Sequence, residues 1–179
     1  MRALRAIGRG PSVWHVNEGH AAFQGVERCR ELVAAGLDFD TAMEVTAGGT
    51  VFTTHTPVAA GHDIFDDELM AAYFEDFATG ELGLEWDAFL ALGRGNGHDD
   101  AFNMTALALR TSRFHNGVSR IHGAVASRME GYIWPQVPAD ENPIGYVTNG
   151  VHVPTFLARE WMGFFDLQFG GQWRSELLN

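Results

Sequence analysis

The stretch TVFTTHTPVAAGH, residues 50–62, decides the fold class of this chain. Its first half combines apolar residues with threonines, which is typical of a half-buried β-strand. Pro57 stops the strand, because its ring nitrogen cannot donate a hydrogen bond to a neighbouring strand. The stretch therefore predicts a strand over Thr50–Thr54. His55 and Thr56 follow it directly, either as ordinary loop residues or as groups that face a ligand.

Strand patterns alternate with helix patterns along the rest of the chain. Further strands are predicted at Ser12–Val16 and Ile144–Thr148, and a short strand or turn at residues 114–119. Helices are predicted at residues 1–7, 17–36, 38–49 (capped by Asp38 or Asp40), 66–93 (two helices separated near residues 80–83), 103–112, 120–133 and after Pro154. Strands separated by helices favour right-handed crossovers and a parallel sheet. The predicted fold class is α/β.

The glycine-rich segment RGNGHDDAF, residues 94–102, superficially suggests a phosphate-binding loop. It follows a helix rather than a strand, and Asp99 and Asp100 would repel a phosphate. The segment is therefore predicted to be a solvated loop.

Composition excludes several classes of function. The chain has 179 residues and a net charge of -11, which argues against nucleic acid or an anionic membrane surface as partner. No apolar run is long enough for a membrane helix, and no secretory signal is expected in the N-terminal residues. Cys29 is the single cysteine, is expected to be a packing residue, and fits a cytoplasmic location. All twelve cationic side chains are arginines, so the chain cannot form a Schiff base through a lysine.

Each of the three main strands is followed by hydrogen-bonding side chains: Asn17, Glu18 and His20; His55 and Thr56; and Asn149. Such residues are common at helix starts as caps. Carboxyl ends of parallel strands also meet at one edge of a sheet, where ligands bind. The pattern fits either separate caps or one shared polar pocket.

The residue types indicate which ligand such a pocket would take. Neutral amides, hydroxyls and imidazoles suit a hydroxyl-rich ligand such as a sugar. A metal site is not predicted, because His15 and His20 are five residues apart and do not share a helix face. A serine nucleophile elbow of the G-x-S-x-G type is absent from the sequence.

Five segments together resemble one known family. They are VWHVNEGHAAF, TVFTTHTPVAAGHD, FNMTALALR, NGVSRIHG and VTNGVHVPTFL. In this order they resemble the α-glucan phosphorylases, which act on glycogen, starch and maltodextrin, and in particular the shorter bacterial and archaeal branch. The resemblance extends from about residue 3 to about residue 173.

The resemblance implies a B-type glycosyltransferase fold, of which this chain would be an incomplete, internal fragment. Residues 1–150 would be the C-terminal part of the first Rossmann-like domain. Residues 151–179 would be the crossing between domains and the first helix of the second domain. The implied reaction is phosphorolysis of a terminal α-1,4-linked glucose to α-D-glucose 1-phosphate. The implied partners are an α-1,4-glucan and inorganic phosphate, with neither nucleic acid nor membrane.

The resemblance also implies pyridoxal phosphate as cofactor of the complete enzyme, bound to a lysine that this chain lacks. The chain alone is therefore expected to be inactive. His55 corresponds to a catalytic-site histidine that binds the glucose 6-hydroxyl, with its carbonyl close to the reacting carbon. The other residues expected to bind substrate are Asn149, Glu18, His20, Asn17, Thr56 and His62.

Two alternative functions remain open at this point. One is a glucan synthase that uses a sugar nucleotide, which would share the cleft and the binding of hydroxyls. The other is a non-catalytic carbohydrate-binding module, which would bind maltooligosaccharides as an isolated chain. An exposed strand edge would also make the isolated chain prone to aggregation.

Overall fold

The structure, a computed structural model, describes residues 2–95, 101–138 and 140–176. Contacts between residues divide the chain into a first unit, residues 1–148, and a second unit, residues 149–179. The two units are described separately below. Residues 96–100, the centre of the predicted solvated loop, lie outside the described residues.

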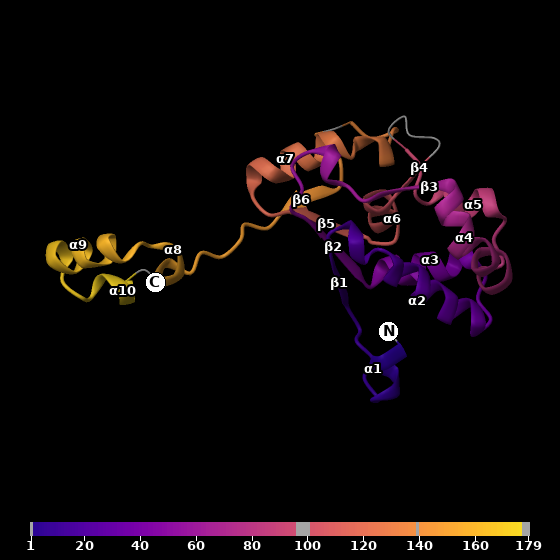
Figure 1. Cartoon of the computed structure of the whole chain (residues 1–179), viewed down its shortest axis with the longest axis horizontal. Coiled ribbons are helices and arrows are strands. Elements are labelled where there is room, and N and C mark those ends of the chain that lie inside the picture. The colour runs from indigo at the N-terminus through magenta and orange to yellow at the C-terminus, as the bar shows by residue number, and fades with distance from the viewer. Residues whose placement is uncertain (1, 96–100, 139, 177–179) are drawn as a thin grey trace. The chain divides into compact units, whose positions relative to one another are not determined.

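A parallel four-stranded sheet forms the centre of the first unit (Figure 1). Its strands are β1 (Trp14–Asn17), β2 (Thr50–Thr54), β5 (Phe114–Gly117) and β6 (Ile144–Tyr146), paired in this order. The spatial order follows the chain order, so every crossover moves in the same direction across the sheet. The predicted α/β class with a Rossmann-like parallel sheet and flanking helices is confirmed.

Helices connect these strands. They are α2 (Phe23–Ala34), α3 (Phe39–Gly48), α4 (Asp67–Phe77), α5 (Trp86–Ala91), α6 (Met104–Arg110) and α7 (Arg120–Met129), and α1 (Arg2–Ala6) precedes β1. Short 3-10 turns are η1 (Gly19–Ala21), η2 (Ala59–Gly61) and η4 (Gly131–Ile133), and η3 (Ala78–Leu82) is a π-helical turn. The helix predicted over residues 17–36 therefore begins only at Phe23, after η1.

A second, antiparallel pair of strands was not predicted from the sequence. β3 (Ile64–Asp66) pairs with β4 (Ala101–Asn103). Each strand has only three residues, which is too short for an alternating pattern to stand out in the sequence.

Side-chain caps fix where several helices begin. Asp38 accepts a hydrogen bond from the Thr41 amide at 2.9 Å, which confirms one of the two caps predicted for α3. Asn103 accepts from the Thr105 amide at 2.8 Å and caps α6. Short polar side chains thus satisfy amides that a helix start leaves unpaired.

The two faces of the sheet differ in burial. The row that crosses the strands through Val16, Phe52 and Ile144 is buried. The neighbouring row contains His15, which is exposed, and Phe114, which is 58% exposed. Right-handed crossovers that all move in one direction place their helices on one face. The burial pattern agrees with helices that cover the face of Val16 and Phe52.

The core continues from the sheet into a stack of aromatic rings. Phe23 stacks on Phe74 with ring centroids 4.5 Å apart, and Phe89 stacks on both Phe74 and Phe102 at 5.7 Å. Such pairs stabilise a core beyond the area that they bury. Cys29 is fully buried in the same core, so its predicted packing role is confirmed.

Both outer strands of the sheet have a single neighbour. β1 pairs only with β2, and β6 only with β5, within the described part of the chain. Their outer edges carry backbone groups that another strand could pair with. Within the same described ranges, no helix is long and apolar enough to cross a membrane.

The second unit is a small helical segment. It contains α8 (Val153–Phe156), with Pro154 in its first turn, α9 (Arg159–Phe169) and α10 (Trp173–Glu176). Phe165 packs against the Trp173 ring at 5.4 Å, and the Trp173 indole donates to Asp166 at 2.9 Å. The assignment of residues 151–179 to the start of a second domain stays a prediction.

A buried polar contact lies beneath the loop that follows β2. The side chains of His62 and Glu130 are 4% and 0% exposed, and His62 Nε2 lies 3.2 Å from Glu130 Oε1. His62 Nδ1 lies 3.4 Å from the Asn103 side-chain amide. Burial of Glu130 as a carboxylate is costly unless this imidazole compensates it.

We predict that the His62–Glu130 contact is strongly coupled in stability. His62→Leu removes the imidazole from beside the buried Glu130 carboxylate and should lower the free energy of unfolding by about 3 kcal/mol. The double variant His62→Leu/Glu130→Met removes both polar groups and should lose much less. Urea denaturation of His62→Leu, Glu130→Met and the double variant measures this, and a double variant that loses the sum of the two single losses contradicts the prediction.

We also predict that Glu27 makes stability depend on acid pH. Arg30 and Arg2 each donate to its carboxylate at 2.8 Å, and these bonds lower the pKa of Glu27 from 4.5 to about 2. A lowered pKa in the folded state adds stability above pH 4.5, which is lost as the pH falls toward 2. Arg2 is largely exposed, so the effect should stay below about 1 kcal/mol.

Urea denaturation at several pH values between 5 and 2 tests this prediction, because this interval contains both the ordinary pKa of Glu27, 4.5, and its lowered pKa of about 2. Glu27→Gln should lose less stability over this interval than the unmodified chain. Glu75→Gln, an exposed position on α4, is the matched control and should behave like the unmodified chain. Equal acid sensitivity of all three proteins would refute the assignment.

Candidate functional site

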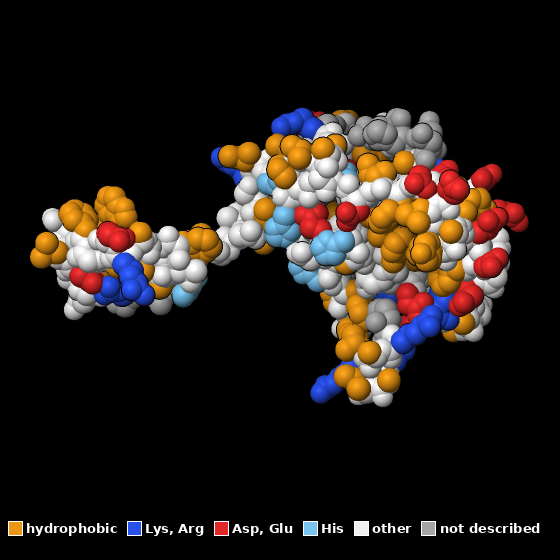
Figure 2. Space-filling view, viewed as in Figure 1, with side chains coloured by type: hydrophobic (Ala, Val, Ile, Leu, Met, Phe, Trp, Pro, Cys, Tyr) orange, Lys and Arg blue, Asp and Glu red, His pale blue; other side chains and the backbone are white. Residues whose placement is uncertain are grey.

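Four of the predicted site residues meet at the carboxyl ends of β1 and β2. The His55 ring nitrogen Nε2 lies 2.9 Å from Asn17 Oδ1. The Glu18 carboxylate accepts hydrogen bonds from the His55 amide and, at 3.2 Å, from the Thr56 hydroxyl. Figure 2 shows histidine side chains beside acidic side chains on one face of the first unit. The structure therefore brings Asn17, Glu18, His55 and Thr56 into one polar cluster, called the strand-end cluster below.

Glu18 has an unusual backbone conformation. Among the described residues it is the one non-glycine with positive φ, at φ 65° and ψ 167°. Only glycine adopts this region freely, and another residue there costs about 1–3 kcal/mol. Side chains of consecutive strand residues normally point to opposite faces. The turn at Glu18 breaks this alternation, so that both Asn17 and Glu18 reach His55.

Gly19 allows this turn to lie close to α6. A Cβ atom at Gly19 would lie 2.9 Å from Thr105 Oγ1 and 3.0 Å from the Thr105 amide nitrogen. A larger residue would push η1 away from α6. The sequence Asn-Glu-Gly is thus explained by position: the first two residues hold His55, and the third permits close packing.

A row of hydrogen bonds leads across the sheet toward the strand-end cluster. Thr53 donates its hydroxyl proton to Asn116 Oδ1 at 3.0 Å, and its oxygen lies 2.7 Å from His15 Nε2. Because the single hydroxyl proton is used on Asn116, His15 Nε2 must donate to Thr53. The sequence analysis missed Thr53 and Asn116, although their positions near the ends of predicted strands could have indicated them.

His122, on α7, holds the other side of the loop that starts at His55. Its Nδ1 accepts from the Val118 amide at 3.2 Å, so Nε2 carries the proton and donates to the Thr56 carbonyl at 3.0 Å. His122 was not among the site residues predicted from the sequence. Its actual contact connects two segments that are 66 residues apart, which no local pattern reveals.

The remaining predicted site residues are His20, His62 and Asn149. His20 is exposed in η1, and no side-chain bond to the strand-end cluster is found in the described residues. His62 is buried against Glu130, so its imidazole could contact a ligand only if this contact opened. Asn149 is an exposed residue of the second unit, and its place beside His55 stays a prediction.

The chemistry of the strand-end cluster is that of hydrogen bonding. It combines an amide, an imidazole, a hydroxyl and one carboxylate, all of which can bind sugar hydroxyls. A group of three or more His, Cys, Asp or Glu side chains that could hold a metal is not found in the part of the chain that the structure describes.

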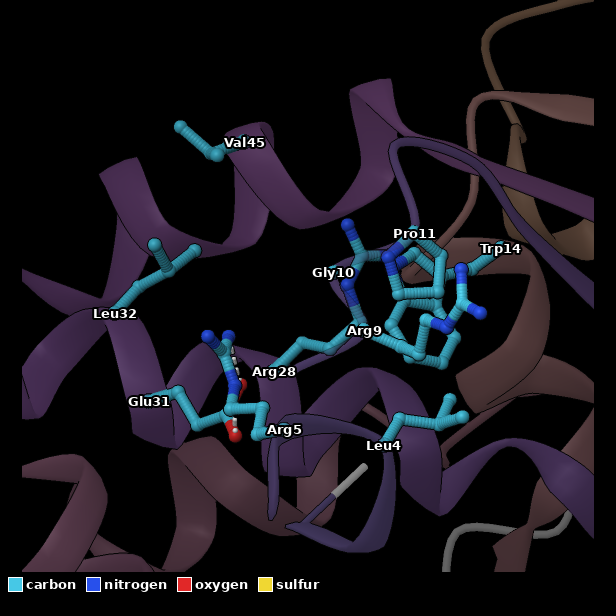
Figure 3. Close-up of a pocket in the computed structure, with 10 residues that line it drawn as sticks. All are labelled: Leu4, Arg5, Arg9, Gly10, Pro11, Trp14, Arg28, Glu31, Leu32 and Val45. Carbon is cyan, nitrogen blue, oxygen red and sulfur yellow. Dashed lines mark hydrogen bonds and ion pairs between the residues drawn. The ribbon is translucent and has the colours of Figure 1, made fainter. Parts of the chain in front are cut away.

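A separate pocket of about 150 Å³ lies near the amino-terminal ends of β1 and β2, at the other end of these strands from the strand-end cluster (Figure 3). Arg28 donates to Thr50 Oγ1 at 2.5 Å and lies 5.5 Å from the centre of the Trp14 ring. Burial lowers the pKa of Arg28. Arg5 is paired with Glu31 at 2.5 Å. Both arginines are therefore engaged by neighbouring groups of the chain.

A second cavity is an apolar groove of about 310 Å³ beside α4. It is lined by Phe23, Phe65, Leu69, Met70, Tyr73 and Phe74. Apolar side chains are also prominent on the face of the first unit that Figure 2 shows. Apart from the Tyr73 hydroxyl, the side chains that line the groove are apolar and could not orient a sugar or a phosphate.

Comparison with known proteins shows several similar phosphorylases. Glycogen phosphorylase of Mycobacterium tuberculosis is 49% identical over 173 residues, which cover 90% of this chain and 20% of the relative. Maltodextrin phosphorylase of Thermococcus litoralis is 43% identical over 97% of this chain and 20% of the relative. Glycogen phosphorylase of Aquifex aeolicus is 31% identical over 93% of this chain and 24% of the relative. No protein-family model matches the chain.

The similarity extends along almost the whole chain, and it includes the segments that form the strand-end cluster. The chain spans about one fifth of the length of the curated relatives it matches. The α/β fold with a parallel sheet agrees with this relationship. The chain therefore belongs to the glycogen and maltodextrin phosphorylase family, as a segment that corresponds to about one fifth of its relatives.

Proposed function

We propose that this chain supplies one wall of the glucose-binding site of an α-glucan phosphorylase. The complete protein would transfer a terminal α-1,4-linked glucose of a glucan to inorganic phosphate and release α-D-glucose 1-phosphate. The observation that carries this proposal is the strand-end cluster: residues expected to bind glucose converge at one sheet edge in a chain 49% identical to a glycogen phosphorylase.

In this proposal the side chains orient the sugar and leave bond cleavage to other groups. The His55 imidazole and the Asn149 amide would share one hydroxyl of the glucose, and Asn17 would hold the imidazole in place. Each such hydrogen bond contributes about 1 kcal/mol net. If these bonds strengthen as the sugar distorts toward the transition state, their energy raises the turnover rate rather than the affinity.

Pyridoxal phosphate, the proposed cofactor of the complete enzyme, does not fit this chain. It is held through an imine to a lysine, and the chain contains no lysine. Another part of the complete protein would have to supply the lysine and the groups that bind the substrate phosphate. This chain alone is therefore proposed to be inactive.

The proposed location is the cytoplasm, where a protein with a single unpaired cysteine is expected to remain reduced. The proposed partners are the glucan and inorganic phosphate. A sugar-nucleotide-dependent synthase is disfavoured, because the similar relatives are phosphorylases.

We predict that the full-length protein that carries this sequence releases glucose 1-phosphate from maltoheptaose only when phosphate is present. Consumption of a sugar nucleotide is assayed in parallel, and only the synthase alternative predicts it. The 179-residue chain should show neither activity. Isothermal titration of this chain with maltoheptaose should give no measurable heat, whereas the carbohydrate-binding module alternative predicts binding.

We further predict that His55→Ala and Asn149→Ala, made in the full-length protein, each lower kcat about fivefold with a much smaller change in KM for the glucan. His152→Ala is the control, because this exposed histidine bonds to Thr155 within the second unit. Steady-state kinetics at saturating phosphate give both constants. Unchanged kcat in both variants would remove His55 and Asn149 from the site.

A further inference from the structure

We propose that Glu18 is a positioning residue, whose carboxylate fixes the backbone and thereby the ring of His55. This inference deepens the proposed function and rests on it, since it assumes that His55 contacts the sugar. It assigns Glu18 a different role from the direct contact with the sugar that the sequence resemblance implies.

The Glu18 carboxylate is fully engaged by the loop that follows β2. Both of its oxygens accept hydrogen bonds from the chain itself: one from the His55 amide and one from the Thr56 hydroxyl. Hydrogen bonds to a charged acceptor are about twice as strong as neutral ones. Glu18 therefore holds two consecutive residues at the point where β2 ends and the loop begins.

Glu18 does not act as a helix cap, which is the usual structural role of a polar residue at this position. Glu18 precedes the 3-10 turn η1, where a side chain often caps the first amides. Its side chain makes no such capping bond. The carboxylate instead reaches across to β2, 37 residues further along the chain.

The backbone of Glu18 is held in a conformation that favours glycine. A glycine would adopt φ 65° and ψ 167° without strain, but it would have no carboxylate. Strained conformations persist where the surrounding structure determines them, and they concentrate at functional sites. Here the strained turn directs the side chains of residues 17 and 18 toward the same histidine.

Together these contacts fix the position of His55 and of Thr56, the residue that follows it. Asn17 binds the ring, Glu18 binds the amide, and His122 binds the carbonyl of Thr56 from the opposite side. An imidazole that must meet one sugar hydroxyl has to be placed within a fraction of an ångström. Loss of the carboxylate should leave His55 in the site but poorly oriented.

The structural test is hydrogen exchange of the His55 amide in the full-length protein, read by mass spectrometry of peptides that cover residues 50–62. Glu18→Ala and Glu18→Gly both remove the carboxylate and should speed exchange of this amide at least about tenfold. Glu18→Gln keeps one acceptor oxygen and should fall between them and the unmodified protein. Glu75→Ala, on exposed α4, is the control and should leave this exchange unchanged.

The two variants without a carboxylate separate its role from that of the backbone. Glycine adopts the positive φ without strain, whereas alanine is strained there. Glu18→Gly should therefore melt at a higher temperature than Glu18→Ala. Both should nevertheless free the His55 amide to the same extent. Unchanged exchange in both variants would overturn the proposal, and so would faster exchange in Glu18→Ala alone.

Kinetics then distinguish positioning from direct binding. A positioning role predicts that Glu18→Ala lowers kcat at least about tenfold with a small change in KM, and that Glu18→Gln restores part of kcat. A rise in KM alone would mean direct contact with the sugar and would overturn the proposal. If the unmodified full-length protein has no phosphorylase activity, the proposed function fails, whereas the exchange result still decides whether Glu18 positions His55.

Discussion

The parallel pairing of β1 with β2 is the constraint on which the strand-end cluster depends. The register places Asn17 opposite Thr53, so the residues that follow both strands emerge at the same edge of the sheet. Asn17 and Glu18 then reach His55 and Thr56, although 37 or 38 residues separate the partners in the chain. The contacts on the far side come from α7, which packs against β5 and β6 and carries His122. The cluster is thus a product of sheet topology rather than of any one segment.

Local sequence signals were sufficient for the main elements and for part of the site. The threonine-rich strand before Pro57, the Asp38 cap and the alternation of strands with helices all depend on neighbouring residues, and all were predicted correctly. Asn17, Glu18, His55 and Thr56 lie together, as the shared-pocket alternative predicted, because parallel strands end at a common edge, and their binding of a sugar stays a prediction. These features need only short-range information and one general rule of topology.

The features that were missed depend on contacts distant in sequence. The β3–β4 pair joins two three-residue segments, and its pairing is set by tertiary packing. The buried contact of His62 with Glu130 joins a loop to the end of α7, so the exposure expected of a ligand-binding histidine was not found. The positive φ of Glu18 is equally hidden, because glutamate gives no local sign of a conformation that glycine usually provides.

The difference between the two faces of the sheet has a consequence for how the chain reaches its native pairing. If β1 slipped by one residue against β2, Val16 would turn into solvent, and His15 and Asn17 would enter the apolar layer beneath the helices. Both changes are unfavourable, so the misaligned form is penalised twice. Burial of Val16 thereby fixes the register of β1 against β2. The same register sets the positions of Asn17 and Glu18, the polar residues that follow Val16.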